Sequence, residues 1–154
     1  MLFRSSNAQE ISEKLSILAA EKILDDIDDI LEDKAKFIDQ DHSKATYAKK
    51  IDKKEGQINW NIEALKIIGK INGLFSVPGA FFNLNGERYK ILKAEIGNGR
   101  GKAGEVISNN LEIACANNQS IKILEIQRQG KKPQKIGEFM LGSKIKKGLV
   151  ILNV

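Results

Sequence analysis

Residues 78–96 read PGAFFNLNGERYKILKAEI, and this stretch decides the fold. Asn85 and Gly86 give the strongest hairpin signal in the chain, because a type I′ turn needs positive φ at both central residues and these two residue types tolerate it at least cost. The arms on either side are rich in aromatic and branched residues, which predicts a pair of antiparallel strands. A lone hairpin is marginally stable in water, so more strands are needed. We expect them at 105–108, 111–116 and 121–127, with a last one at 149–152.

These segments together predict a mostly β fold, an OB-like antiparallel β-barrel of about five to six strands with a packed helix. An N-terminal α-helix over about residues 8–31 precedes the barrel, because apolar residues recur there at helical spacing behind a capping box of Asn7 and Glu10. The predicted domain organisation is an N-terminal helix in 1–38, a basic linker in 39–57 and the OB-like domain in 58–154.

Two shorter helices are predicted within the OB-like domain. Asn61 is expected to cap the first, which runs from residue 62 to about residue 74. Pro133 suits the first position of the second, which Gly142 would end. The inward side chains of the first of these helices are predicted to be Leu65, Ile68, Ile71 and Phe75.

Charge is unevenly distributed along the chain. Residues 1–41 hold 5 basic and 11 acidic side chains, residues 42–118 hold 12 and 7, and residues 119–154 hold 8 and 2. An acidic N-terminal segment before a basic remainder indicates different roles for the two parts. The basic residues 42–154 favour a polyanionic partner, of which nucleic acid is the commonest. Plain solubility of a lysine-rich protein is the competing interpretation.

The single cysteine excludes an internal disulfide and fits a reducing cytosol, so a cytoplasmic location is expected. No apolar run approaches the roughly 20 residues of a membrane span, and no membrane partner is expected.

The residue types that carry catalysis are sparse and poorly placed. His42, the only histidine, lies in the charged linker, which favours a solvated side chain over a general base. Cys115 lies at strand spacing in an apolar segment, which favours burial over nucleophilic attack. Gly99, Gly101 and Gly104 match the spelling of a dinucleotide-binding loop, but a strand is predicted after them, so they are expected to form a mobile loop between strands. The sequence therefore argues against self-contained catalysis, against a cofactor and against a metal in this chain.

Binding is the function that remains. The sheet face and loops of an OB-like barrel often hold nucleic acid. Trp60 and the phenylalanines are predicted to be core residues rather than stacking platforms, which favours recognition of backbone or shape over base stacking. The candidate phosphate contacts in the C-terminal part are Lys122, Arg128, Lys131, Lys132 and Lys135.

Several short stretches, taken in order, resemble one family. They are ATYAKKI at 45–51, GQINW at 56–60, PGA at 78–80, KILKA at 90–94, GEV at 104–106, ILEIQ at 123–127, GKKP at 130–133 and FMLG at 139–142. In this combination they are similar to the C-terminal part of the methionyl-tRNA formyltransferase family, over about residues 40–148. Residues 7–38 look like the last helix of that family's catalytic domain and the start of its linker.

The resemblance implies a role in translation initiation, where the family transfers a formyl group from 10-formyltetrahydrofolate to methionyl initiator tRNA. Nothing in this chain matches the family's folate-binding or catalytic motifs, so the chain alone is expected to be inactive. The family's linker and C-terminal domain present a basic surface to the tRNA. The tRNA-binding candidates carried over on that basis are Lys50, Lys53, Lys131 and Lys132, with Arg128 added on its charge alone.

One departure from the family weakens part of this expectation. Between Ile71 and Pro78 the family tends to show an Arg and an Asn-Pro-Trp-Pro run, whereas this chain has Asn72, Phe75, Ser76 and Val77 there. Met1 begins where a catalytic domain of the family would be nearly complete, which is expected of a cloned fragment, a split-gene product or a remnant.

The implied partners are initiator tRNA, a separate formyltransferase catalytic domain and a second copy of this chain. A homodimer is expected because the apolar stripe of the N-terminal helix is longer than monomers usually expose. Two other functions stay open: a self-associating structural remnant without tRNA binding, and the tail of a sugar-nucleotide formyltransferase. The basic turn at 130–132 favours tRNA over a sugar nucleotide. The stripe consists of Ile11, Leu15, Leu18, Ile27 and Ile30.

Overall fold

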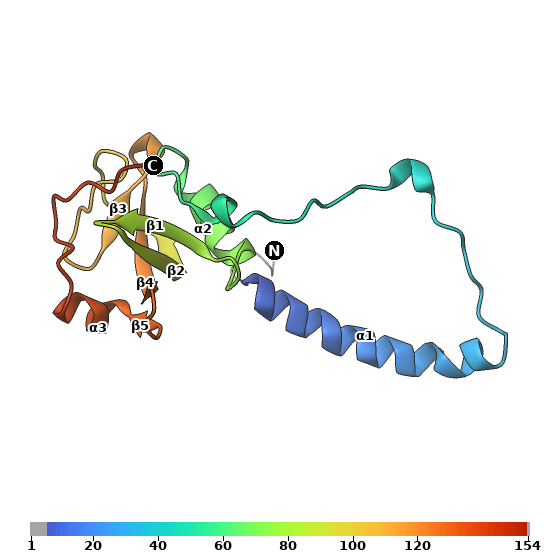
Figure 1. Ribbon diagram of the computed structural model, residues 1–154. Coiled ribbons are helices and arrows are strands. Elements are labelled where there is room, and N and C mark those ends of the chain that lie inside the picture. Colours follow the sequence, from blue (N-terminus) through green and yellow to red (C-terminus); the bar gives the residue numbers. More distant parts are fainter. Residues whose placement is uncertain (1–5, 154) are drawn as a thin grey trace.

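The computed structural model describes residues 6–153 and divides them into a body and an arm. The body is built on an antiparallel sheet, and the arm consists of helix α1 (Ala8–Leu31) and a long linker that returns to the body (Figure 1). The predicted bounds of α1 are confirmed, and so is its capping box. The Asn7 side chain accepts from the Glu10 amide at 2.9 Å, and the Glu10 carboxylate accepts from the Asn7 amide at 3.2 Å.

The linker after α1 is extended and largely exposed. Two single turns of 3-10 helix interrupt it, η1 (His42–Lys44) and η2 (Lys53–Gly56). Gly56 is the first buried residue after α1, and it brings the chain onto the body. The next residues are held there because the Ile58 amide donates to the Phe81 carbonyl at 2.8 Å.

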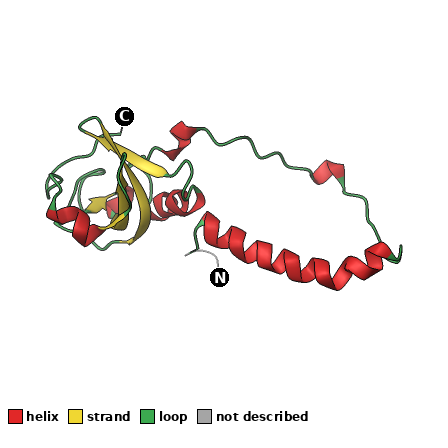
Figure 2. Ribbon diagram, turned by 60° about the horizontal axis from the view of Figure 1, so that its bottom comes forward, coloured by secondary structure: helices red, strands yellow, loops and turns green. Residues whose placement is uncertain are grey.

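The sheet contains the predicted hairpin. Strands β1 (Ala80–Leu84) and β2 (Glu87–Ile96) pair antiparallel around Asn85 and Gly86, whose φ angles of 51° and 78° confirm the expected positive-φ turn. The remaining strands are β3 (Glu112–Ala114), β4 (Ser120–Arg128) and β5 (Gln134–Lys135). Their order is β1-β2-β4-β3, and β5 pairs with the far end of β4. Figure 2 shows the sheet with the helices of the body beside it and α1 standing away.

The fold is mixed rather than mostly β. Within the described residues the α-helices contain 24, 10 and 6 residues, and the strands contain 5, 10, 3, 9 and 2. The closed barrel that we predicted is not shown, because β1 and β3, the two ends of the strand order, do not pair with each other.

Two predicted strands, 105–108 and 149–152, are reduced to isolated bridges. Val106 pairs with Ile113, and Glu105 pairs with Val150. The physical reason is that turns limit the pairing. The Glu105 amide donates to the Lys102 carbonyl at 2.8 Å, and the Ser108 hydroxyl accepts from the Glu112 amide at 3.1 Å. The Leu149 amide likewise donates to the Lys146 carbonyl at 3.1 Å.

The core lies on the inner face of the sheet, and an aromatic row runs through it. Ring centroids are 6.0 Å apart for Trp60 and Phe82, 5.3 Å for Phe82 and Tyr89, and 6.0 Å for Tyr89 and Phe139. Trp60 is fully buried and Phe82 nearly so, as predicted for core residues. The row ends at Phe139, the buried residue of helix α3 (Ile136–Leu141).

Helix α2 (Ala64–Gly73) starts later than predicted and is capped differently. The Asn61 amide binds the Asn59 side chain at 2.9 Å, which forms a local turn before the helix. The first amide of the helix, that of Ala64, instead donates to the Gln119 side chain at 2.9 Å. Leu65 faces solvent with 65% of its surface exposed, whereas Ile67 is buried, so the inward face was predicted wrongly at Leu65.

Helix α3 also starts later than predicted. Pro133 does not open it, because Gln134 and Lys135 first pair with β4 as the short strand β5. Gly142 ends the helix as expected. No helix in residues 6–153 is long and apolar enough to cross a membrane.

Candidate nucleic-acid interface

A cleft of about 630 Å³ opens at the tip of the β1–β2 hairpin. The hairpin, the end of β4, the β4–β5 turn and α3 surround it, and Tyr89 and Phe139 bring the aromatic row of the core to its wall. The charged side chains of its lining are basic at Arg128, Lys131, Lys132 and Lys144 and acidic at Glu87 and Glu138. The excess of cations gives the cleft a positive field that suits an anionic ligand.

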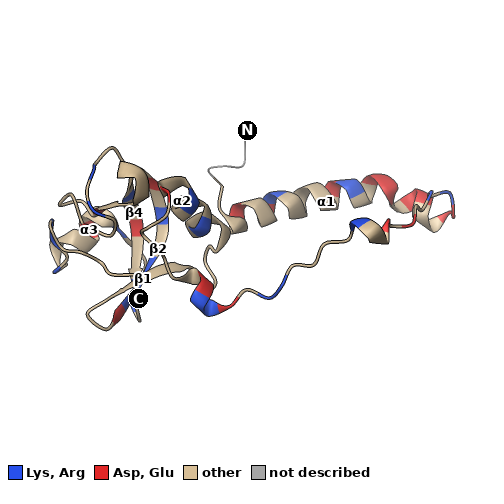
Figure 3. Ribbon diagram, turned by 90° about the horizontal axis from the view of Figure 1, so that it is seen from above, with Lys and Arg blue, Asp and Glu red and all other residues tan. Residues whose placement is uncertain are grey.

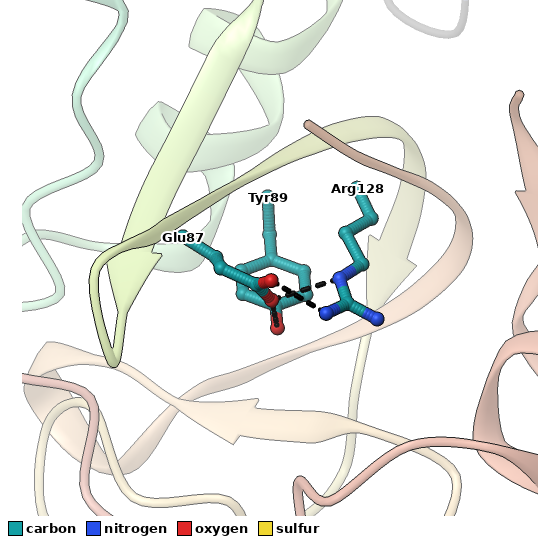
Figure 4. A network of polar contacts seen from close by, with 3 residues as sticks. All are labelled: Glu87, Tyr89 and Arg128. Carbon is teal, nitrogen blue, oxygen red and sulfur yellow. Dashed lines mark hydrogen bonds and ion pairs between the residues drawn. The ribbon is translucent and has the colours of Figure 1, made fainter. Parts of the chain in front are cut away.

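One ion pair with an added tyrosine organises the wall of this cleft (Figure 4). The Arg128 Nε donates to Glu87 Oε2 at 2.8 Å, and its Nη2 donates to Oε1 in a bidentate pair. The Tyr89 hydroxyl donates to the same carboxylate at 2.8 Å. These contacts join β2 to β4 beside the turn of the hairpin, where Tyr89 and Arg128 are register partners.

The pKa values of the three groups follow from this arrangement. The hydrogen bond from Arg128 lowers the pKa of the Glu87 carboxyl, and the bond from Tyr89 adds to that effect. Burial raises the pKa of the Tyr89 hydroxyl, and its bond to Glu87 raises it further. The bond to Glu87 also raises the pKa of the Arg128 guanidinium. The carboxylate therefore stays charged at neutral pH and occupies the guanidinium.

Lys131 and Lys132 lie in the tight turn between β4 and β5. The Lys131 amide donates to the Arg128 carbonyl at 3.0 Å, and Gly130 takes φ of 72° to close the turn. The Gln127 side chain donates to the Lys131 carbonyl at 2.9 Å. The backbone that carries both lysines is thus held, while their side chains are exposed.

The structure brings together three of the five predicted tRNA-binding residues: Arg128, Lys131 and Lys132 all line the cleft. Lys50 and Lys53 lie outside its lining, exposed on the linker and on η2. Sequence reasoning missed Lys144, which follows α3 and completes the basic lining. The run of lysines at 144–147 was the available signal.

The two residues considered for catalysis, His42 and Cys115, lie outside the lining of the cleft. His42 is exposed at the start of η1. Cys115 is buried, and burial raises the pKa of its thiol to about 11, which keeps it protonated at neutral pH. Among the described residues no group of three or more His, Cys, Asp or Glu side chains is placed to hold a metal ion.

The glycine-rich segment at 97–104 is a loop between β2 and β3, as predicted, and it contacts the half-buried carboxylate of Glu112. The Glu112 Oε1 accepts from the Gly99 amide at 2.8 Å and from the Ser120 hydroxyl at 2.6 Å. A Cβ on Gly97 would lie 2.2 Å from Glu112 Oε1, so a larger residue there would displace that carboxylate. Burial opposes ionisation of Glu112, but the bonds from Ser120 and Gly99 outweigh it and lower its pKa.

The acidic residues of the arm and the basic residues near the body lie in different places. Figure 3 shows acidic residues gathered along α1 and the turn that follows it, and a basic cluster where η2 meets the body. A polyanion would therefore be attracted to the body and the near end of the linker, and repelled by the far end of α1.

Comparisons with known proteins point to one family. Residues 50–144 match the family described as "Formyl transferase, C-terminal domain". The chain is 63% identical over 150 residues to methionyl-tRNA formyltransferase of Pelagibacter ubique, covering 97% of this chain and 48% of the relative. It is 40% identical over 148 residues to methionyl-tRNA formyltransferase of Rickettsia massiliae, covering 93% of this chain and 47% of the relative. The chain thus spans about half the length of these relatives.

A solved structure shares the fold. A variant of HypX from Aquifex aeolicus superposes with a TM-score of 0.72 at 16% identity, covering 94% of this chain and 28% of that one. This distant likeness concerns the fold alone, whereas the family match extends from the linker lysines through the β4–β5 turn to Lys144. The resemblance inferred from short motifs is thereby confirmed: the chain belongs to the formyl transferase C-terminal domain family.

Proposed function

We propose that this chain binds initiator tRNA as the C-terminal portion of a methionyl-tRNA formyltransferase. The observation that carries the proposal is the 63% identity to such an enzyme over 97% of this chain. The basic lining of the cleft supplies a physical basis, because lysines that neutralise phosphates release counterions and so drive association.

The proposed contacts are Lys50, Lys53, Lys131 and Lys132, which are exposed on the linker, η2 and the β4–β5 turn. Arg128 takes a different part in the proposal. Its guanidinium is bound by Glu87, so we assign it to holding the cleft wall in shape, with direct phosphate contact left to the neighbouring lysines.

We further propose that these 154 residues do not transfer a formyl group by themselves. The buried, protonated Cys115 and the exposed His42 support this, because neither has the paired partner that nucleophilic or general-base catalysis requires. In the proposal, 10-formyltetrahydrofolate is bound by a separate catalytic domain, and the sheet of the body corresponds to an opened OB-like barrel that binds the tRNA.

The test is a titration of initiator tRNA against the intact chain at several salt concentrations. The double variant Lys131→Ala/Lys132→Ala is compared with wild type. We expect its log–log salt slope to be smaller by about two units, because each removed lysine would neutralise one phosphate. The matched control is Lys14→Ala/Lys36→Ala, which removes the same charge from exposed positions of the arm.

Equal slopes for wild type and the turn variant would remove the β4–β5 turn from the interface. Absence of salt-dependent binding by wild type would refute the proposed function itself. Formylation of methionyl-tRNA by the purified chain, supplied with 10-formyltetrahydrofolate, would contradict the assignment of catalysis to a separate domain.

The exposed stripe of α1 supports a second proposal, a protein partner for the arm. Helix α1 has no buried residue, and 57% of Leu15 and 52% of Leu18 are exposed. Only the first turns of α1 approach α2, across a groove lined by Ile11, Leu15, Leu65 and Ile68. We propose that the stripe pairs with a second copy of the chain, with a separate catalytic domain as the other occupant to be tested.

Sedimentation equilibrium of the intact chain tests whether the stripe pairs with a second copy. A dimer at micromolar concentration that is absent in Leu18→Asp/Ile27→Asp supports pairing through the stripe. A monomeric wild type, or a dimer unaffected by the two substitutions, contradicts it.

A further inference from the structure

The β1–β2 hairpin has a second face, opposite to the cleft, that the candidate residues above do not include. On the inner face, Phe82 is the register partner of Tyr89 and packs in the core. Alternation along the strands places Phe81 on the other face, where its register partner is Lys90. Arg88, the partner of Asn83, lies on this face too. We call the face formed by Phe81, Asn83, Arg88 and Lys90 the outer face.

The guanidinium of Arg88 lies over an aromatic ring on the outer face. The carbon of its guanidinium lies 4.1 Å from the centroid of the Phe81 ring, and Phe81 is only 3% exposed. Arg88 is exposed to solvent, and a guanidinium already placed over a ring loses less freedom when it binds a ligand. Arg88 has no carboxylate partner among the described residues, in contrast to Arg128.

The Phe81 ring also contacts the end of the linker. A Cβ on Gly56 would lie 3.1 Å from the Phe81 ring and 2.3 Å from the Gly79 carbonyl oxygen, so η2 packs directly on this part of the sheet. Lys53 and Lys54 of η2 are therefore held beside the outer face. Their acidic neighbours are engaged in the cap of that turn, since Asp52 accepts from the Lys54 amide and Glu55 accepts from the Asp52 amide, both at 2.7 Å.

The outer face also leads to the β4–β5 turn. Lys90 is the register partner of Gln127 in β4, and the Gln127 side chain donates to the Lys131 carbonyl. The Lys90 ammonium donates to the Ser76 carbonyl at 3.3 Å, and an ammonium has two further donors to offer. Cationic side chains thus follow one another from η2 across the hairpin to the turn.

We propose that Arg88 and Lys90 bind phosphates, and that the outer face joins the linker lysines and the β4–β5 turn into one surface for the sugar–phosphate backbone of RNA. The proposal rests on the proposed function, because it names further contacts for the same tRNA. It accounts for the separation of Lys53 from the cleft, since the outer face supplies the missing contacts between the two groups. It also predicts recognition without base stacking, because the one aromatic ring on this face is covered by Arg88.

The test titrates initiator tRNA against the intact chain and four variants at several salt concentrations. Arg88→Gln and Lys90→Gln each remove one charge from the outer face, and Lys14→Gln removes one from the exposed surface of α1. Arg88→Lys keeps the charge and removes the planar guanidinium that lies over Phe81. We expect Arg88→Gln and Lys90→Gln each to lower the salt slope by about one unit, and Lys14→Gln to leave it unchanged. Arg88→Lys should keep the slope and weaken binding.

The outcomes separate this inference from the function on which it rests. Binding by wild type that weakens in Lys131→Ala/Lys132→Ala but not in Arg88→Gln or Lys90→Gln overturns the outer face and leaves the proposed function standing. Absence of tRNA binding by wild type overturns both. Thermal unfolding of each variant, with a midpoint close to that of wild type, shows that a reduced slope reflects the missing charge rather than an unfolded body.

Discussion

Helices α1 and α2 differ in where their stability originates. Helix α1 has 24 residues, no buried side chain and a cap supplied within its own first turn by Asn7 and Glu10. Helix α2 has 10 residues, buries Ala64, Ile67 and Ile71, and takes its cap from Gln119, which is 55 positions away. The first helix is specified by local sequence, and the second exists because the body folds around it.

This difference shows that the arm and the body are stabilised in different ways. Isolated helices are marginal in water, and most helical stability in proteins comes from packing of an apolar face. Helix α2 has that packing, whereas the apolar face of α1 is exposed. Substitutions in the two regions should therefore have effects of different size and different reach.

The largest expected difference lies between core and arm truncations. Phe82→Ala removes a ring that packs between Trp60 and Tyr89, and we expect it to lower the free energy of unfolding by about 3–5 kcal/mol. The control Leu24→Ala in α1, where 74% of the side chain is exposed, should change it by less than about 0.5 kcal/mol. Urea unfolding followed by tryptophan fluorescence measures both, since Trp60 is in the core. Similar losses for the two variants would mean that α1 is as well packed as the body.

The remote cap of α2 provides the next test. Gln119→Ala removes the acceptor of the Ala64 amide, and we expect a loss of about 1 kcal/mol in the free energy of unfolding of the whole body. The matched control is Gln129→Ala, which truncates an exposed glutamine at the end of β4. If both variants unfold at the same urea concentration as wild type, the remote cap contributes nothing to the fold.

The local cap of α1 should give a smaller and strictly local effect. Asn7→Ala removes the acceptor of the Glu10 amide, which should weaken the first turn of α1 by about 0.5–1 kcal/mol. Hydrogen exchange of the amides in that turn should become faster, while the unfolding midpoint of the body stays unchanged. Ser12→Ala, an exposed position within α1, serves as control. A shift of the body's midpoint in Asn7→Ala would show that arm and body unfold together.

Acidification should affect a loop of the body and spare its core. The pKa of Glu112 is below its ordinary value of 4.5, so the bonds that its carboxylate accepts contribute fully above that value and are lost as pH falls through the lowered one. The amide resonance of Gly99, which donates to Glu112, should titrate in that range below pH 4.5. Glu112→Gln should abolish the titration. A Gly99 resonance that is insensitive to pH in wild type would contradict the role of Glu112 in closing the loop.

The sequence by itself determined the elements whose signals are local. The type I′ turn at Asn85 and Gly86, the bounds of α1 and its capping box needed only residues a few positions apart, because positive φ and helix caps are local properties. The family was also readable from short motifs, and the basic turn at 130–132 identified two of the four cationic side chains that line the cleft.

Only the tertiary structure decided what depends on residues far apart in the chain. In the structure α2 starts at Ala64, whose amide is capped by Gln119. Gln134 and Lys135, which follow Pro133, form strand β5. The sheet stays open instead of closing a barrel. The tertiary structure also distinguished two arginines that the sequence presents alike: Arg128 is bound by Glu87, whereas Arg88 lies over the Phe81 ring and has no carboxylate partner within residues 6–153. Strand pairing sets which side chains meet, and neither the composition of a segment nor its periodicity contains that pairing.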